Sequence, residues 1–127
     1  MTVAALKSGD MQIVISDEVA GPRFAHVQLS SAIGSASSRV HGLELAPFLV
    51  ALAKLDETLK GQARLEGIEG DFRLDLKAGR LGHLDVEARI SDLERSSDFY
   101  VSGQVEPGEL SAFLRSCRSL ELESVTC

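Results

Sequence analysis

The strongest constraint on the fold is an alternation of apolar and polar residues through four consecutive segments of the second half of the chain. A period of two places every second side chain on the same side of a β-strand. Each segment therefore predicts a strand with one buried and one hydrated face, as antiparallel sheets allow. The apolar positions are Ala63 and Leu65, then Phe72, Leu74 and Leu76, then Leu84, Val86, Ala88 and Ile90, and finally Phe99, Val101 and Val105.

The first half has a weaker version of the same pattern. The residues from Met11 to Ser16 predict a strand that follows the turn sequence Ser8-Gly9-Asp10, and those from Phe24 to Ile33 predict a second strand. In this second strand Val27, Leu29 and Ile33 share one face. Residues 34–38 predict a loop or a weak edge strand, and Arg39 to Leu45 predict a further strand.

Two segments have the helical period instead. From Ala46 to Lys60, apolar residues recur on one face, Pro47 suits the first turn and Gly61 suits the left-handed stop. A second helix is predicted from Pro107 to Ser119, and the tail after it, residues 120–124, predicts a short edge strand. The segments 45–49 and 110–114 are faintly similar to each other.

These elements predict an α+β fold: a curved antiparallel sheet of about six to eight strands with two helices packed on its buried face. The length of 127 residues indicates a single domain, residues 1–127. With five Phe, one Tyr and no Trp, the core is expected to be mainly aliphatic.

The charge is acidic and unevenly distributed. Of the formal net charge of −6, the segment 62–127 carries −5, from eight basic and thirteen acidic residues. A phosphate backbone would be repelled, and no cluster of Lys and Arg offers a footprint for one, so nucleic-acid binding is not expected. No signal peptide and no apolar run of the roughly 20 residues needed to cross a bilayer is evident, so we expect a cytoplasmic protein without membrane contact.

Reactive side chains do not gather into a recognisable site. Three histidines (His26, His41 and His83) and two cysteines (Cys117 and Cys127) are scattered. The spacing of the histidines does not fit a helical zinc site, and neither a nucleophile elbow nor a phosphate-binding glycine loop is present. We therefore expect no catalytic residues, no metal ion, no cofactor and no enzyme activity.

A pair of carboxylates is the strongest alternative for acid–base chemistry. If the loop of the second hairpin is Gly79-Arg80-Leu81, Asp75 faces Asp85 and Arg73 faces Glu87. His83 then lies beside Lys77 or Asp75, depending on the register. Acid–base catalysis by two carboxylates needs environments that drive their two pKa values apart. A hydrated sheet face does not do this, so we interpret these residues as an ordinary polar face.

Acidic residues cluster at one end of this polar face. They are Glu87, Asp92, Glu94 and Asp98, the last three in the expected loop 91–98. The spacing does not match a calcium loop. Because complementary charge accelerates association, we expect these four residues to bind a basic protein partner.

A longer stretch resembles a known family. The segments Leu59-Lys-Gly61-Gln-Ala-Arg-Leu65 and Glu69-Gly-Asp-Phe-Arg-Leu-Asp-Leu76 are followed by Leu81-Gly-His-Leu-Asp-Val86 and, after one more strand, by Leu110-Ser-Ala-Phe-Leu114. Over roughly residues 40–120 this resembles WapI-type bacterial immunity proteins and related small families of unknown function. The resemblance implies a cytoplasmic antitoxin that neutralises a polymorphic toxin, with Gly82 and His83 as markers of the fold.

Two other functions remain open at this stage. The protein is alternatively a small-molecule-binding or self-assembling domain, with Phe48, Phe72, Phe99 and Phe113 lining a cavity between helices and sheet. An enzyme that uses His83 as a base is the least favoured interpretation. The sequence also leaves open whether the protein is a monomer or a homodimer.

Overall fold

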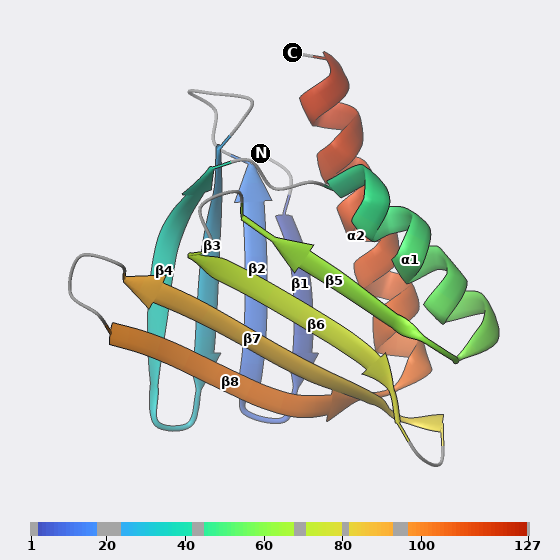
Figure 1. Ribbon diagram of the computed structural model, residues 1–127, viewed down its shortest axis with the longest axis horizontal. Helices are drawn as coiled ribbons and strands as arrows, with labels where there is room; N and C mark the ends of the chain where they lie inside the picture. Colours follow the sequence, from blue (N-terminus) through green and yellow to red (C-terminus); the bar gives the residue numbers. More distant parts are fainter. Residues whose placement is uncertain are drawn as a thin grey trace.

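The computed structural model of the protein describes residues 3–17, 24–41, 45–67, 71–79, 82–92 and 97–126. Ten elements follow one another along the chain, and four strands and a helix occur twice in the same order (Figure 1). They are β1 (Val3–Ser8), β2 (Met11–Asp17), β3 (Phe24–Ser31), β4 (Gly34–His41), α1 (Leu45–Thr58), β5 (Gln62–Glu66), β6 (Phe72–Ala78), β7 (Leu84–Asp92), β8 (Ser97–Val105) and α2 (Pro107–Thr126).

The eight strands form two antiparallel sheets of four, in place of the single curved sheet expected from the sequence. The N-terminal sheet has the order β1-β2-β3-β4, and the C-terminal sheet has the order β5-β6-β7-β8. Alternation determines which face of a strand is buried, but not which strands share a ladder. Helix α1 lies between β4 and β5 in the chain and contacts β5. It therefore occupies the side of β5 at which a continuous sheet would have to extend.

The two sheets pack against each other, with the strands of one crossing those of the other (Figure 1). Their facing sides supply most of the core, including Ile13, Val27, Leu74 and Val86, which are 0% exposed. Within the described residues no polar or charged residue is buried. Burial of every second residue in β5 and β6 confirms the predicted strand phases. The opposite side of the C-terminal sheet is thereby left mainly to polar side chains.

The helices lie side by side along one flank of the paired sheets, beyond β1 and β5 (Figure 1). This differs from the expected position over the face of a sheet, because that face is already covered by the other sheet. Each helix contacts the first strand of the other half: α1 follows β4 but contacts β5, and α2 follows β8 but contacts β1. The two halves therefore exchange their helices.

The helices meet through residues in equivalent positions. Phe48 is the fourth residue of the segment 45–49, and Phe113 is the fourth residue of the similar segment 110–114. Their rings pack in a T-shaped, edge-to-face arrangement, with centroids 6.4 Å apart and an interplanar angle of 73°. Contact between equivalent residues is typical of an isologous interface. The two helices thus contact each other through equivalent residues of the two halves.

The ends of the helices differ from those predicted. Helix α1 ends at Thr58 because Leu59 adopts a left-handed conformation with φ 54°, and Gly61 follows with φ 95°. Helix α2 continues to Thr126, so the edge strand predicted over residues 120–124 is wrong. Alternating Leu and Glu in this tail imitates a strand, but both residues favour helix and no Gly or Pro interrupts it.

Two strands of the N-terminal sheet were poorly marked in the sequence. The strand β1 was not predicted. The serine-rich residues 34–38, predicted as a loop or a weak edge strand, belong to β4, which is an edge strand of its sheet, so the second alternative is correct. Ile33 was placed in the buried phase but lies in the turn between β3 and β4, where it is 93% exposed. Pairing with β3 along the full length of β4 organises a segment whose own pattern is weak. No helix within the described residues is both long and apolar enough to cross a bilayer.

Candidate functional site

The most distinctive surface of the molecule is the outward side of the C-terminal sheet, called here the charged face. Because Ala63, Leu74 and Val86 point inward, their neighbours along each strand point to solvent. The strand pairing aligns these outward residues in three rows across the sheet. The rows are Gln62, Lys77, Asp85 and Gln104; Arg64, Asp75, Glu87 and Ser102; and Glu66, Arg73, Arg89 and Tyr100.

Asp75 is the most enclosed carboxylate of the charged face, with a side chain 13% exposed. Its Oδ1 accepts hydrogen bonds from Arg64 Nε at 2.6 Å and from Gln62 Nε2 at 3.2 Å. Its Oδ2 lies 3.3 Å from Arg73 Nε. The hydrogen bond to Asp75, followed by the charge of that carboxylate, raises the pKa of Arg64 above its ordinary value. Asp75 thus fixes two arginines on neighbouring strands.

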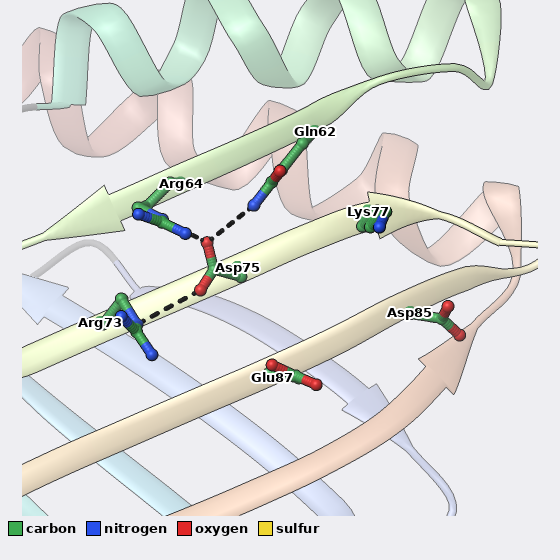
Figure 2. A pocket seen from close by; sticks show the side chains of 7 residues that line it. All are labelled: Gln62, Arg64, Arg73, Asp75, Lys77, Asp85 and Glu87. Atoms are coloured by element: carbon green, nitrogen blue, oxygen red, sulfur yellow. Dashed lines mark hydrogen bonds and ion pairs between the residues drawn. The ribbon is translucent and has the colours of Figure 1, made fainter.

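A hollow of about 380 Å³ opens on the charged face (Figure 2). Its described lining comes from β5, β6 and β7 and includes both signs of charge: Gln62, Arg64, Arg73, Asp75, Lys77, Asp85 and Glu87. Figure 2 shows Asp75 between Arg64 and Arg73, with Glu87 on the next strand. The hollow is suited to binding charged groups, because its lining is almost entirely ionic.

The register of β6 and β7 differs from the expected one by two residues. Asp75 is opposite Glu87 and Lys77 is opposite Asp85, so the expected pairs of Asp75 with Asp85 and of Arg73 with Glu87 are wrong. The cause is the length of the loop, because Ala78 and Leu84 form the last pair of the ladder and leave residues 79–83 outside it. The observed register places Arg73 opposite Arg89 and one carboxylate opposite another. Like charges directly opposite each other are unfavourable.

Tyr100 is a large exposed aromatic side chain of the charged face, with 53% exposure. It is opposite Arg89 in the ladder between β7 and β8. Partial burial, followed by a hydrogen bond with Glu87 and the charge of that carboxylate, raises the pKa of the phenol. Tyr100 therefore lies close to Glu87 and directly opposite Arg89.

The predicted partner-binding residues are distributed over two parts of the sheet. Glu87 is exposed and lines the hollow. Asp92 is the last residue of β7 and Asp98 is an exposed residue near the start of β8, so the expected loop 91–98 is shorter than predicted. Glu94 lies outside the described residues. Sequence reasoning did not select Arg73, Arg89 or Tyr100, because their relation depends on the register.

Among the described residues, His83 has a carboxylate partner, but no histidine belongs to a group that could hold a metal ion. His83 lies outside the ladder, and its Nδ1 is 3.4 Å from Glu106 Oε1 at the start of α2, not beside Lys77 or Asp75. His26 is an exposed residue of β3. Within the described part of the chain, no group of three or more His, Cys, Asp and Glu side chains is arranged to hold a metal ion.

The phenylalanines proposed to line an internal cavity are packed into the core. Phe48, Phe72 and Phe113 are at most 1% exposed, and Phe99 packs against the same core. Cys117 is 0% exposed on α2, and burial raises the pKa of its thiol to about 12. A thiol in this state is a poor nucleophile because the reactive species is the thiolate. The described core residues thus provide neither a cavity lined by these phenylalanines nor a reactive thiol at Cys117.

Comparison of the chain with protein-family models, with curated sequences and with solved structures gives no significant match.

Proposed function

We propose that the protein is a non-enzymatic protein-binding domain and that the charged face is its recognition surface. In the setting that the sequence resemblance implies, it is a cytoplasmic immunity protein that occupies and neutralises a toxin domain. The acidic residues Glu87, Asp92, Glu94 and Asp98 are the proposed contacts for basic side chains of that partner.

The observation that carries this proposal is the register of β6 and β7. Two like-charge pairs, Arg73 with Arg89 and Asp75 with Glu87, stand directly opposite each other. Each such pair is expected to reduce stability by about 0.2–1 kcal/mol. Residues that break a local rule of stability concentrate at functional sites. Because Asp75 already pairs with Arg64 and Arg73, a partner of opposite charge would give the larger relief at the pair of Arg73 with Arg89.

The composition of the hollow favours binding over chemistry. Its described lining consists of Gln, Arg, Asp, Lys and Glu side chains, without a serine, cysteine or histidine nucleophile. A mixture of both charges gives a protein partner specificity, because a wrong partner would meet like charges. The same mixture is poorly suited to a phosphate chain, which would meet Asp75, Asp85 and Glu87 inside the hollow.

The direct test is binding to toxin domains encoded next to the gene. Each candidate domain is produced in a host cell with and without this protein, and growth and complex formation are measured. We expect one domain to be bound and growth to be restored. The charge-reversed variant Glu87→Lys/Arg89→Glu should bind at least about tenfold more weakly, which corresponds to about 1.4 kcal/mol.

A matched control carries the same two charges on the other sheet. The variant Gln28→Lys/Ser37→Glu changes exposed residues of the N-terminal sheet and should bind and protect like the wild type. Failure of every neighbouring domain to bind would reject the immunity role. Equal binding by the wild type and the Glu87→Lys/Arg89→Glu variant would reject the charged face as the recognition surface.

A further inference from the structure

The carboxylates in the three rows of the charged face all have a contact within the protein. Asp75 is bound by Arg64, Arg73 and Gln62. Glu66 Oε1 lies 3.7 Å from Arg64 Nη1, and Asp85 Oδ1 accepts a hydrogen bond from Gln104 Nε2 at 3.1 Å. Glu87 lies close enough to Tyr100 to raise the pKa of its phenol. The acidic groups of these rows are therefore partly compensated before any partner arrives.

Two cations of the same rows have no such contact. Among the residues that the structure describes, none makes a hydrogen bond or an ion pair with the side chain of Lys77 or Arg89. Lys77 is exposed and lines the hollow, whereas Arg89 is half-buried and stands opposite Arg73. The Nε of Arg73 is already directed to Asp75, so the Nη groups of two neighbouring guanidinium groups remain for a ligand. Among the described side chains of these rows, the two charged groups without a partner are therefore both cations.

We infer that Lys77 and Arg89 receive two carboxylates of an extended acidic segment of the partner, and that Tyr100 packs against the same segment. This inference rests on the proposed function, and it identifies the chemistry of the partner at that surface. Guanidinium groups bind carboxylates with paired hydrogen bonds, and Arg and Tyr are the residues that most often dominate protein interfaces. The exposed ring of Tyr100 lies directly opposite Arg89, which places an apolar contact beside the charged one.

The positions of the two cations define the spacing of the ligand. Lys77 belongs to the first row and Arg89 to the third, which are four residues apart along a strand. At about 3.4 Å per residue, four residues of a strand span about 14 Å. An extended partner segment with acidic side chains at positions i and i+4 has the same spacing, and both side chains point to the same side. The Asp75 and Glu87 row lies between the two sites and disfavours a third acidic group at position i+2.

Tyr100 provides the readout, because the chain has one tyrosine and no tryptophan. The full-length protein is titrated with a blocked peptide of the sequence Glu-Ser-Thr-Ser-Glu, and the emission of Tyr100 is followed. We expect a saturable change that weakens as salt is added. Peptides with Gln or with Lys in place of both Glu should give no saturable change.

Variants of the protein then locate the site. Arg89→Gln should weaken binding of the Glu peptide by at least about fivefold, and Lys77→Gln should weaken it less. Lys7→Gln, an exposed position of β1 in the other sheet, is the matched control and should have no effect. Binding of the Lys peptide as tight as that of the Glu peptide, no saturable binding of the Glu peptide, or unchanged affinity in Arg89→Gln would each overturn the inference.

The two proposals fail in different ways. If Glu87→Lys/Arg89→Glu loses a toxin domain that Arg89→Gln and Lys77→Gln still bind with wild-type affinity, the charged face remains the recognition surface and the inferred carboxylate contacts are wrong. If no toxin domain binds but the Glu peptide binds with the expected dependence on Arg89, the contacts stand and the immunity role is wrong.

Discussion

The two sheets are alike on their inner sides and different on their outer sides. Inward, both present aliphatic residues at alternate positions of four antiparallel strands. Outward, the N-terminal sheet presents mostly Ser, Gln, Ala and Val, and its described outward residues include no carboxylate. The C-terminal sheet presents the three charged rows. The same interior can therefore support one outer face with few charges and another with many, which is why fold alone does not define function.

The likeness of the two interiors is best tested where the halves meet. Phe48→Ala and Phe113→Ala each remove a ring that is at most 1% exposed, and each should lower the free energy of unfolding by about 3–5 kcal/mol. Urea unfolding measures both. Because the rings contact each other, the double variant should lose less than the sum of the two single losses. Strongly unequal single losses would show that the two halves are not packed in equivalent ways.

A second comparison uses one equivalent pair of the helices, Leu52 on α1 and Cys117 on α2, each four residues after its phenylalanine and 0% exposed. The thiol ionises near pH 9.0 when unperturbed but at about 12 in the folded protein. The folded state thus holds a proton that the unfolded chain releases in this window. Stability should therefore fall as pH rises from about 9 towards 12, by at most about 1.4 kcal/mol per pH unit.

The measurement is urea unfolding at about pH 8 and about pH 10.5 for the Cys127→Ser protein and for the same protein with Cys117→Val. Between these values the protein with Cys117 should lose about 2 kcal/mol more than the one with Val, which cannot ionise there. Equal losses in both proteins would show that Cys117 is not held neutral by burial.

On the charged face, Asp75 should matter more to stability than any single residue of the other outer face. Asp75→Asn weakens contacts with Arg64 and Arg73, and we expect a loss of about 1 kcal/mol in unfolding free energy. Gln28→Ala on the N-terminal sheet is the control and should stay within about 0.5 kcal/mol of the wild type. If the Asp75→Asn variant is as stable as the wild type, the ion pairs of the charged face do not contribute to the stability of the sheet.

The smallest expected effect has the opposite sign. Arg89→Gln relieves the repulsion with Arg73, so it should leave the stability unchanged or raise it by up to about 0.5 kcal/mol while weakening ligand binding. Thermal unfolding in low salt is the measurement, because salt screens the repulsion. A clear loss of stability would mean that Arg89 has a structural role and would remove the reason to regard it as held for a partner.

Local patterns predicted much of the fold. The phases of β5, β6 and β7 and most of α1 follow from the periodicity of apolar residues alone. The division into two sheets did not, because it depends on contacts between distant parts of the chain, such as α2 with β1 and β3 with β8. The full extent of β4 and α2 was also missed, since Ser-rich and Leu-Glu segments take their conformation from neighbours or from intrinsic helix preference.

For the candidate site, Glu87 was selected from the sequence but Arg89 and Tyr100 were not. Charge near one end of the sheet is visible in the sequence, whereas the opposition of Arg73 and Arg89 depends on the length of one loop. A two-residue change in register replaces the pair of Arg73 with Glu87 by that of Arg73 with Arg89 without altering which side chains are buried. The alternation of apolar residues therefore identifies the buried face of each strand but not the register that decides which outward side chains are paired.

The exchange of helices also sets the order of events in folding. Helix α2 contacts β1, so the last element of the structure completes the environment of the first. During synthesis α1 can meet β5 almost at once, because the two are adjacent in the chain, but the apolar flank of β1 stays uncovered until α2 is made. Contacts of such long sequence separation slow folding and prolong the exposure of apolar surface. Removal of residues from α2 should accordingly expose β1, at the opposite end of the chain, to proteases before any other strand.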